Sequence, residues 1–97
     1  MIETQDQAKK IDRHGQLCDM LNDVYVKKNH DYNDSFHETF LEEGMAMPRI
    51  RLSDKLNRFK QLSKTEQMVH DESIIDTLMD LANYALMTIL EIEEQKG

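Results

Sequence analysis

Basic residues, helix breakers and cysteine are all scarce in this chain of 97 residues. The 12 Lys and Arg stand against 19 Asp and Glu, and the net charge is -7 at pH 7. This balance argues against binding to a nucleic acid polymer, because neutralising backbone phosphates requires an excess of basic residues. Cys18 is the one cysteine, so an intramolecular disulfide is excluded and nothing indicates secretion. With 3 Gly and 1 Pro, the composition favours a compact helical protein over a β-rich one.

Long uninterrupted hydrophobic runs are also missing. The first fifteen residues are polar and do not have the pattern of a signal peptide. Near the end of the chain, Thr88 and Glu91 interrupt the longest apolar run and Asp80 precedes it, so we predict no membrane span. We therefore expect a cytoplasmic protein of one domain, residues 1–97, without a membrane partner.

The apolar residues recur at helical spacing, and no period-two alternation is found. The expected helices are residues 3–28, 36–43, 48–62 and 71–94. The predicted fold class is all-α, a small bundle of three main helices and one short helix. The last helix is apolar on more sides than its short neighbours can cover, so we expect a homo-oligomer.

Local signals mark the ends of these helices. Thr4 with Gln7 is a weak capping box for the first helix, and Ser35 with Glu38 has the same pattern before the second. Gly44 follows the second helix at the position where a left-handed residue commonly ends one.

The last helix carries a polar stripe on its apolar body. Glu72, Asp76, Asp80 and Asn83 follow one another at spacings of four, four and three. These offsets place them within an arc of roughly 80° on one face. Carboxylates stacked in this way repel one another unless cations or hydrogen-bond donors lie opposite.

The helix expected at 48–62 carries a complementary stripe of Arg51, Asp54, Lys55 and Arg58. An antiparallel hairpin would place the two stripes face to face. One interpretation is a buried salt-bridge network that fixes helix register. The other is a Mg²⁺-dependent phosphate site, because Mg²⁺ bridges carboxylates to phosphates. Its candidate metal ligands are Asp54, Glu72, Asp76 and Asp80, its catalytic residues are Asp76 and Asp80, and its phosphate or ligand contacts are Arg51, Lys55, Arg58 and Asn83.

Residues 29–35 are dense in Asn, Asp and Ser and are predicted to form a loop. One interpretation is that this loop binds a base or sugar through Asn29, His30, Asp31 and Tyr32. The alternative is a turn that ends the first helix, with the tyrosine packed on the core. Elsewhere, we interpret His14 and His37 as incidental and Cys18 as a small core residue.

Three motifs resemble a known family. They are Asp31-Tyr32, Arg51-Leu52-x-Asp54-Lys55-x-x-Arg58, and Asp76-x-x-x-Asp80-x-x-Asn83-Tyr84. Over about residues 20–92 the chain resembles the nucleotide modification associated domain 1 family, which occurs in phages and bacteria. More distantly, it is similar to all-α nucleoside triphosphate pyrophosphohydrolases of the MazG and dimeric dUTPase type. This resemblance implies an oligomeric, Mg²⁺-dependent helical enzyme that cleaves between the α- and β-phosphates of a nucleotide, in the cytoplasm of a bacterial or phage-infected cell.

The chain departs from the pyrophosphohydrolase pattern at two positions. That pattern has Glu-x-x-Glu on one helix and Glu-x-x-Asp on the next, whereas this chain has Arg51 and Asn83 at two of the four carboxylate positions. The resemblance therefore supports nucleotide binding better than hydrolysis. The alternative functions are a non-catalytic phage-type protein that sequesters a nucleotide signal or carries a modified nucleotide, and a purely structural oligomer.

Overall fold

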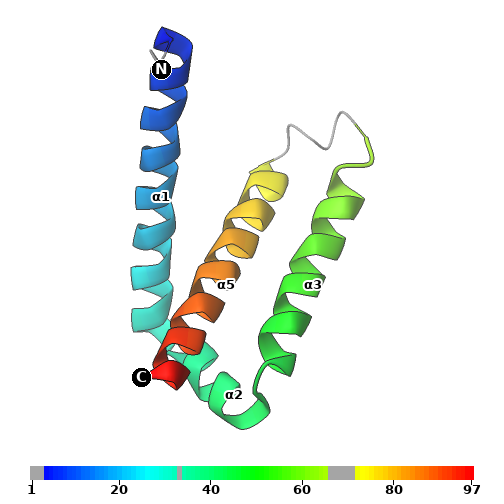
Figure 1. The fold of residues 1–97 in the computed structure, drawn as a ribbon. Helices are drawn as coiled ribbons and strands as arrows, with labels where there is room; N and C mark the ends of the chain where they lie inside the picture. The colour runs from blue at the N-terminus through cyan, green and yellow to red at the C-terminus, as the bar shows by residue number, and fades with distance from the viewer. Residues whose placement is uncertain (1–3, 33, 66–71) are drawn as a thin grey trace. The chain divides into compact units, whose positions relative to one another are not determined.

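The computed structural model describes residues 4–32, 34–65 and 72–97. They form four helices, and no strand occurs among them, which confirms the all-α prediction. The helices are α1 (Gln5–Tyr32), α2 (Ser35–Glu43), α3 (Ala46–Leu62) and α5 (Glu72–Lys96) (Figure 1). The chain divides into two compact units, Met1–Asn33 and Asp34–Gly97, which are described separately below.

The first unit is formed by α1. Its predicted capping box is confirmed, because the Thr4 amide donates to the Gln7 side chain at 3.0 Å and the Gln7 amide donates to the Thr4 hydroxyl at 3.1 Å. The predicted loop at 29–35 is wrong for residues 29–32, which continue the helix. Asn and Asp reduce helix stability by at most about 0.7 kcal/mol per residue relative to Ala, so a helix that is already formed can extend through them.

The second unit begins at Asp34, whose φ of 55° and ψ of 45° are left-handed. Asp adopts this conformation more readily than most residues. Asp34 is the N-cap of α2 and Ser35 is already helical, so the predicted capping box of Ser35 and Glu38 is wrong. The predicted end of α2 is confirmed, because Gly44 has a φ of 65° and its amide donates to the Phe40 carbonyl at 2.8 Å.

α3 and α5 run antiparallel within this unit (Figure 1). α3 begins at Ala46, two residues before its predicted start, and Pro48 lies in its first turn, where a missing amide hydrogen costs no helical bond. Of the two predicted caps of α5, Ser73 lies inside the helix, whereas Asp71 lies outside the described residues. His70, expected in the connection, also lies outside them.

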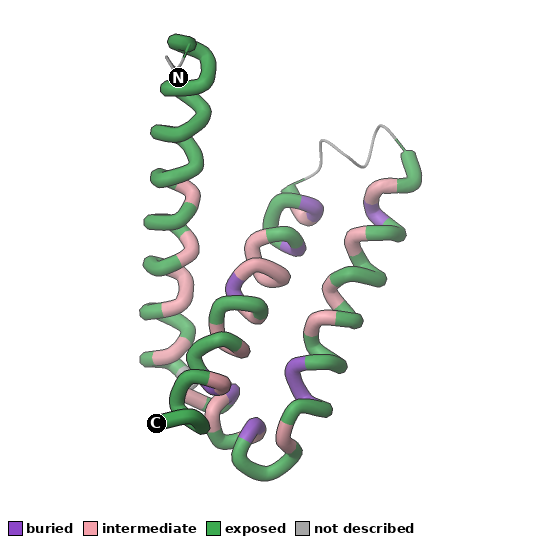
Figure 2. The backbone as a smooth tube through the Cα atoms, in the orientation of Figure 1, coloured by how far each residue is buried: buried purple, intermediate pink, exposed green. Residues whose placement is uncertain are grey.

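The hydrophobic core of the second unit forms where α2 meets the other two helices. Phe36, Phe40 and Met47 are buried together, and Tyr84 and Met87 of α5 pack against them. The rings of Phe36 and Tyr84 stack with centroids 5.9 Å apart and an interplanar angle of 18°. Figure 2 shows further buried positions along both α3 and α5. This packing fixes which faces of α3 and α5 can take part in a site.

α5 is strongly apolar. Within the part of the chain that the structure describes, it is long and apolar enough to cross a membrane, with a mean hydropathy of 1.2, although core helices of soluble proteins pass the same test. The predicted absence of a membrane span therefore stays a prediction. Several of its large side chains are exposed, with exposed fractions of 55% for Ile75, 50% for Leu86 and 52% for Ile89.

Candidate functional site

An ion pair between α3 and α5 joins the two polar stripes. Lys55 Nζ lies 2.9 Å from Asp80 Oδ2, and each side chain is 27% exposed. The pair joins a predicted phosphate ligand to a predicted metal ligand. The antiparallel hairpin therefore brings the stripes together as expected, and this contact between them is a partly exposed salt bridge.

The other predicted phosphate ligands follow Lys55 along α3. Arg51 lies one turn before it and Arg58 one turn after it, and both side chains are exposed. Asn83 lies one turn beyond Asp80 on α5 and is buried, with an exposed fraction of 8%. The cationic stripe is thus accessible to a ligand, whereas Asn83 belongs to the interior of the hairpin.

The predicted metal ligands are spread along their helices. Asp54, Glu72 and Asp76 are exposed, and Asp80 is half-buried against Lys55. Within the described residues, the oxygens of these four carboxylates do not gather into a group of three that could hold an ion. Mg²⁺ commonly uses only one or two carboxylates together with substrate phosphates, so a preformed cage is not required for the predicted chemistry.

The predicted base-binding residues lie in the last turn of α1, in the first unit. Asn29 is half-buried, His30 and Asp31 are exposed, and His30 Nδ1 lies 3.6 Å from Asp31 Oδ1. The side chain of Tyr32 lies outside the described part of the structure. Because these residues form a helical turn, the three described side chains project at helical spacing and do not line a loop.

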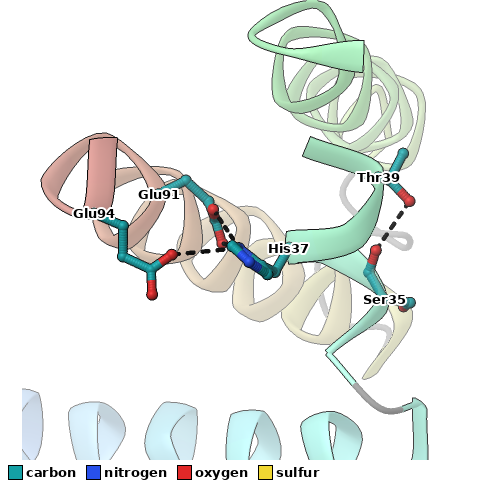
Figure 3. A network of polar contacts seen from close by, with 5 residues as sticks. All are labelled: Ser35, His37, Thr39, Glu91 and Glu94. Atoms are coloured by element: carbon teal, nitrogen blue, oxygen red, sulfur yellow. Dashed lines mark hydrogen bonds and ion pairs between the residues drawn. The ribbon is translucent and has the colours of Figure 1, made fainter. Parts of the chain in front are cut away.

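A polar cluster that the sequence did not single out joins α2 to α5 (Figure 3). His37 Nδ1 lies 2.8 Å from Glu91 Oε2, 3.0 Å from Glu91 Oε1 and 3.3 Å from Glu94 Oε2. Interpreting His37 as incidental was therefore wrong. The available signal was Glu91, a carboxylate among apolar positions of the last helix, which proves to be 6% exposed. A buried carboxylate requires a donor or a cation.

The electrostatics of this cluster favour the imidazolium form of His37. The hydrogen bond to Glu91 raises the pKa of His37 above its ordinary value of 6.5, and the charges of Glu91, Glu94 and Asp34 raise it further, while burial acts in the opposite direction. The contact is therefore a charge-assisted one in slightly acidic solution.

The interpretation of Cys18 as a core residue was wrong, because its side chain is exposed on α1. Its sulfur lies 3.8 Å from His14 Nδ1, one turn away. Cys18 does lie at helical spacing with apolar residues of α1. The described residues of the first unit are nevertheless half-buried or exposed, so this spacing does not place Cys18 in a core.

Comparison with known proteins identifies the family. The model of the family described as nucleotide modification associated domain 1 matches residues 28–92, a span that includes α2, α3 and all but the last residues of α5. No curated protein and no solved structure matches the chain. The resemblance found in the three sequence motifs is confirmed, and the chain belongs to the nucleotide modification associated domain 1 family.

Proposed function

We propose that this protein binds a nucleotide, or a small molecule derived from one, on the surface formed by α3 and α5. The observation that carries the proposal is the contact between Lys55 and Asp80, together with the exposed Arg51 and Arg58 one turn to either side of Lys55 on α3. Arg binds phosphate oxygens in a bidentate manner, and Lys acts as a point charge. The description of the family supports a nucleotide as the ligand class.

In the first form of the proposal, the protein is a Mg²⁺-dependent nucleoside triphosphate pyrophosphohydrolase. Asp76 and Asp80, with Glu72 on the same helix and Asp54 on α3, are the residues that would hold the ion. The ion would supply charge neutralisation and an activated water when bound. Asp80 cannot serve a cation fully while it is paired with Lys55. If the pair breaks when the ligand binds, the Lys55 ammonium becomes free to bind a phosphate oxygen. The Asp80 carboxylate becomes free to bind the metal ion at the same time.

In the second form, the protein captures the nucleotide without turnover. Two observations favour it. The Lys55 ammonium already neutralises one of the expected carboxylates, and Asn83 is a buried amide at a position where the pyrophosphohydrolase pattern has a carboxylate. A protein of this kind would sequester a nucleotide signal, as a phage protein acting against host defence would do, or would carry a modified nucleotide.

Mass spectrometry distinguishes the two forms. The full chain is incubated with a panel of nucleoside triphosphates, with and without Mg²⁺, and is then denatured so that any bound ligand is released. Pyrophosphate and a monophosphate that depend on Mg²⁺, and that are lost in Asp76→Ala and Asp80→Ala, indicate hydrolysis. Intact nucleotide recovered from the protein without metal indicates capture.

A matched pair of charge reversals tests the site itself. Arg58→Glu should abolish nucleotide binding, because it reverses a charge on the proposed phosphate face. Arg49→Glu should leave binding intact, because Arg49 is exposed on a different face of the same helix. This proposal is wrong if neither variant changes the thermal shift with nucleotide, or if no nucleotide gives a shift, and the salt-bridge interpretation is then favoured.

We propose further that the active form is a homo-oligomer in the cytoplasm of a bacterial or phage-infected cell. The exposed apolar side chains of α5, among them Ile75, Leu86 and Ile89, support self-association. Sedimentation analysis at micromolar concentration tests it, and Leu86→Glu should shift an oligomer toward smaller species. A monomer at that concentration would contradict the proposal.

A further inference from the structure

We propose that His37, Glu91 and Glu94 form a binding site for a divalent transition metal ion, with Zn²⁺ as the best match. One ligand atom from each residue lies within 4.8 Å of the other two, and the three residues come from two helices. Figure 3 shows the imidazole of His37 directed from α2 toward both carboxylates of α5. No residue of this cluster belongs to the proposed nucleotide surface, so this inference does not depend on the proposed function.

The spacing of the ligand atoms is close to that of a coordination shell. In a tetrahedral zinc site with bonds of about 2.0–2.2 Å, neighbouring ligand atoms are about 3.4 Å apart. The imidazole nitrogen lies 2.8 and 3.0 Å from the two oxygens of Glu91 and 3.3 Å from the nearer oxygen of Glu94. To reach this spacing, the nitrogen-to-oxygen distances need to lengthen by at most about 0.6 Å, and the ligand atoms of the three residues already lie within 4.8 Å of one another.

Burial and charge also favour an ion. The side chain of Glu91 is 8% exposed, and a second carboxylate, that of Glu94, faces the same imidazole. Two carboxylates and one imidazolium leave one negative charge unbalanced, whereas two carboxylates, a neutral imidazole and a divalent cation sum to zero. The charge of Glu91 is buried, where it is costly, so a divalent cation that neutralises the cluster is favoured at this carboxylate.

The donor set selects the type of metal. One imidazole nitrogen with carboxylate oxygens suits Zn²⁺ and its neighbours in the first transition series better than Mg²⁺ or Ca²⁺, which prefer oxygen donors alone. Three protein ligands leave a fourth position for water. The Glu94 side chain is 64% exposed, so this position is open to solvent. The competing interpretation is an ion pair whose only role is to hold α2 on α5.

The experiment uses Co²⁺ as a spectroscopic probe and Zn²⁺ as its competitor. The 97-residue chain carrying Cys18→Ser, so that the exposed thiol does not compete, is freed of metal with a chelator and titrated with Co²⁺. We expect absorption bands of tetrahedral Co²⁺ at one ion per chain, bleached by Zn²⁺. Because loss of even an outer-shell partner typically costs about 10- to 100-fold in affinity, loss of a ligand should weaken binding by about 100-fold or more.

Two matched pairs of variants locate the ion. His37→Gln and Glu94→Gln should lose the bands, whereas His30→Gln and Glu93→Gln should keep them, since His30 and Glu93 are exposed and lie outside the cluster. If circular dichroism shows that His37→Gln does not fold, the result for Glu94→Gln tests the proposal. The Glu94 side chain is mostly exposed, so its replacement should leave the fold intact. The proposal is overturned if Co²⁺ shows no tetrahedral bands, or if all four variants bind it equally.

Discussion

Two consecutive side chains of α2 have opposite surroundings. Phe40 is 8% exposed in the core of the second unit, and Leu41 is 58% exposed. Phe40→Ala should lower the free energy of unfolding by about 3–5 kcal/mol, because it removes a buried ring and leaves a cavity. Leu41→Ala should change it by less than about 0.5 kcal/mol. Urea denaturation followed by circular dichroism measures both, and equal effects would show that α2 is not packed as described.

His37 predicts a pH dependence of stability in metal-free solution. Its hydrogen bond to Glu91 raises its pKa above 6.5 in the folded state, so the folded chain holds the proton more tightly than the unfolded chain. The resulting stabilisation is fully present below pH 6.5 and is lost as the pH rises through the raised pKa. His37→Gln should lack this decline.

The measurement is urea denaturation at closely spaced pH values with a chelator present. His30→Gln is the control, because His30 is exposed and lies outside the cluster, and its curve should follow that of the unmodified protein. Parallel curves for the unmodified protein and His37→Gln would show that the contact contributes nothing to stability through its charge.

At the scale of elements, the ends of the helices depend on single backbone conformations. Gly44 has a φ of 65° and a ψ of -149°, a region that is essentially restricted to glycine. Gly44→Ala should therefore destabilise the second unit by about 1–3 kcal/mol through backbone strain alone, because no atom lies within 4 Å of the added methyl group. Thermal unfolding measures the effect.

Gly15 provides the opposite control. It lies inside α1, and a methyl group added there also meets nothing within 4 Å. Gly15→Ala should raise the helicity of α1, with a gain of about 0.5–1 kcal/mol, because glycine is a poor helix former. A loss of helicity in Gly15→Ala, or a neutral Gly44→Ala, would contradict the assigned conformations.

The elements themselves were readable from the sequence, but some of their boundaries were not. Apolar spacing gave all four helices, and Thr4, Gln7 and Gly44 marked ends that the structure confirms. The end of α1 was missed, because the residues that favour turns at 29–32 lower helix stability only slightly. The start of α2 follows the left-handed backbone of Asp34, which the side-chain types alone do not specify.

At the scale of the whole molecule, the sites could be predicted only where the sequence shows which helices pack against each other. Lys55 and Asp80 were predictable as partners, because they lie on neighbouring helices that a short connection folds back on each other. The partner of His37 was not, because the packing of α2 against the far end of α5 depends on how Phe36 stacks on Tyr84. Sequence periodicity identifies the apolar face of a helix but not the neighbour that covers it.

The net charge of -7 gives a prediction for the molecule as a whole. Duplex DNA should not be bound at physiological salt, because the chain lacks the basic excess that phosphate neutralisation needs, even though Arg51, Lys55 and Arg58 suit one small phosphate ligand. An electrophoretic mobility assay measures this, with nucleotide binding by the same sample as its positive control. A retarded band that disappears with added salt would contradict the expected ligand size.

The contact between His37 and Glu91 closes a ring of chain, since the two residues are 54 positions apart. Closing so long a loop costs conformational entropy, so we expect this contact to form late in folding. Unlike a contact between residues one helical turn apart, it can form only after α2 and α5 have come together. We therefore expect the side chains that hold α2 on α5 to affect how fast the second unit unfolds more than how fast it folds.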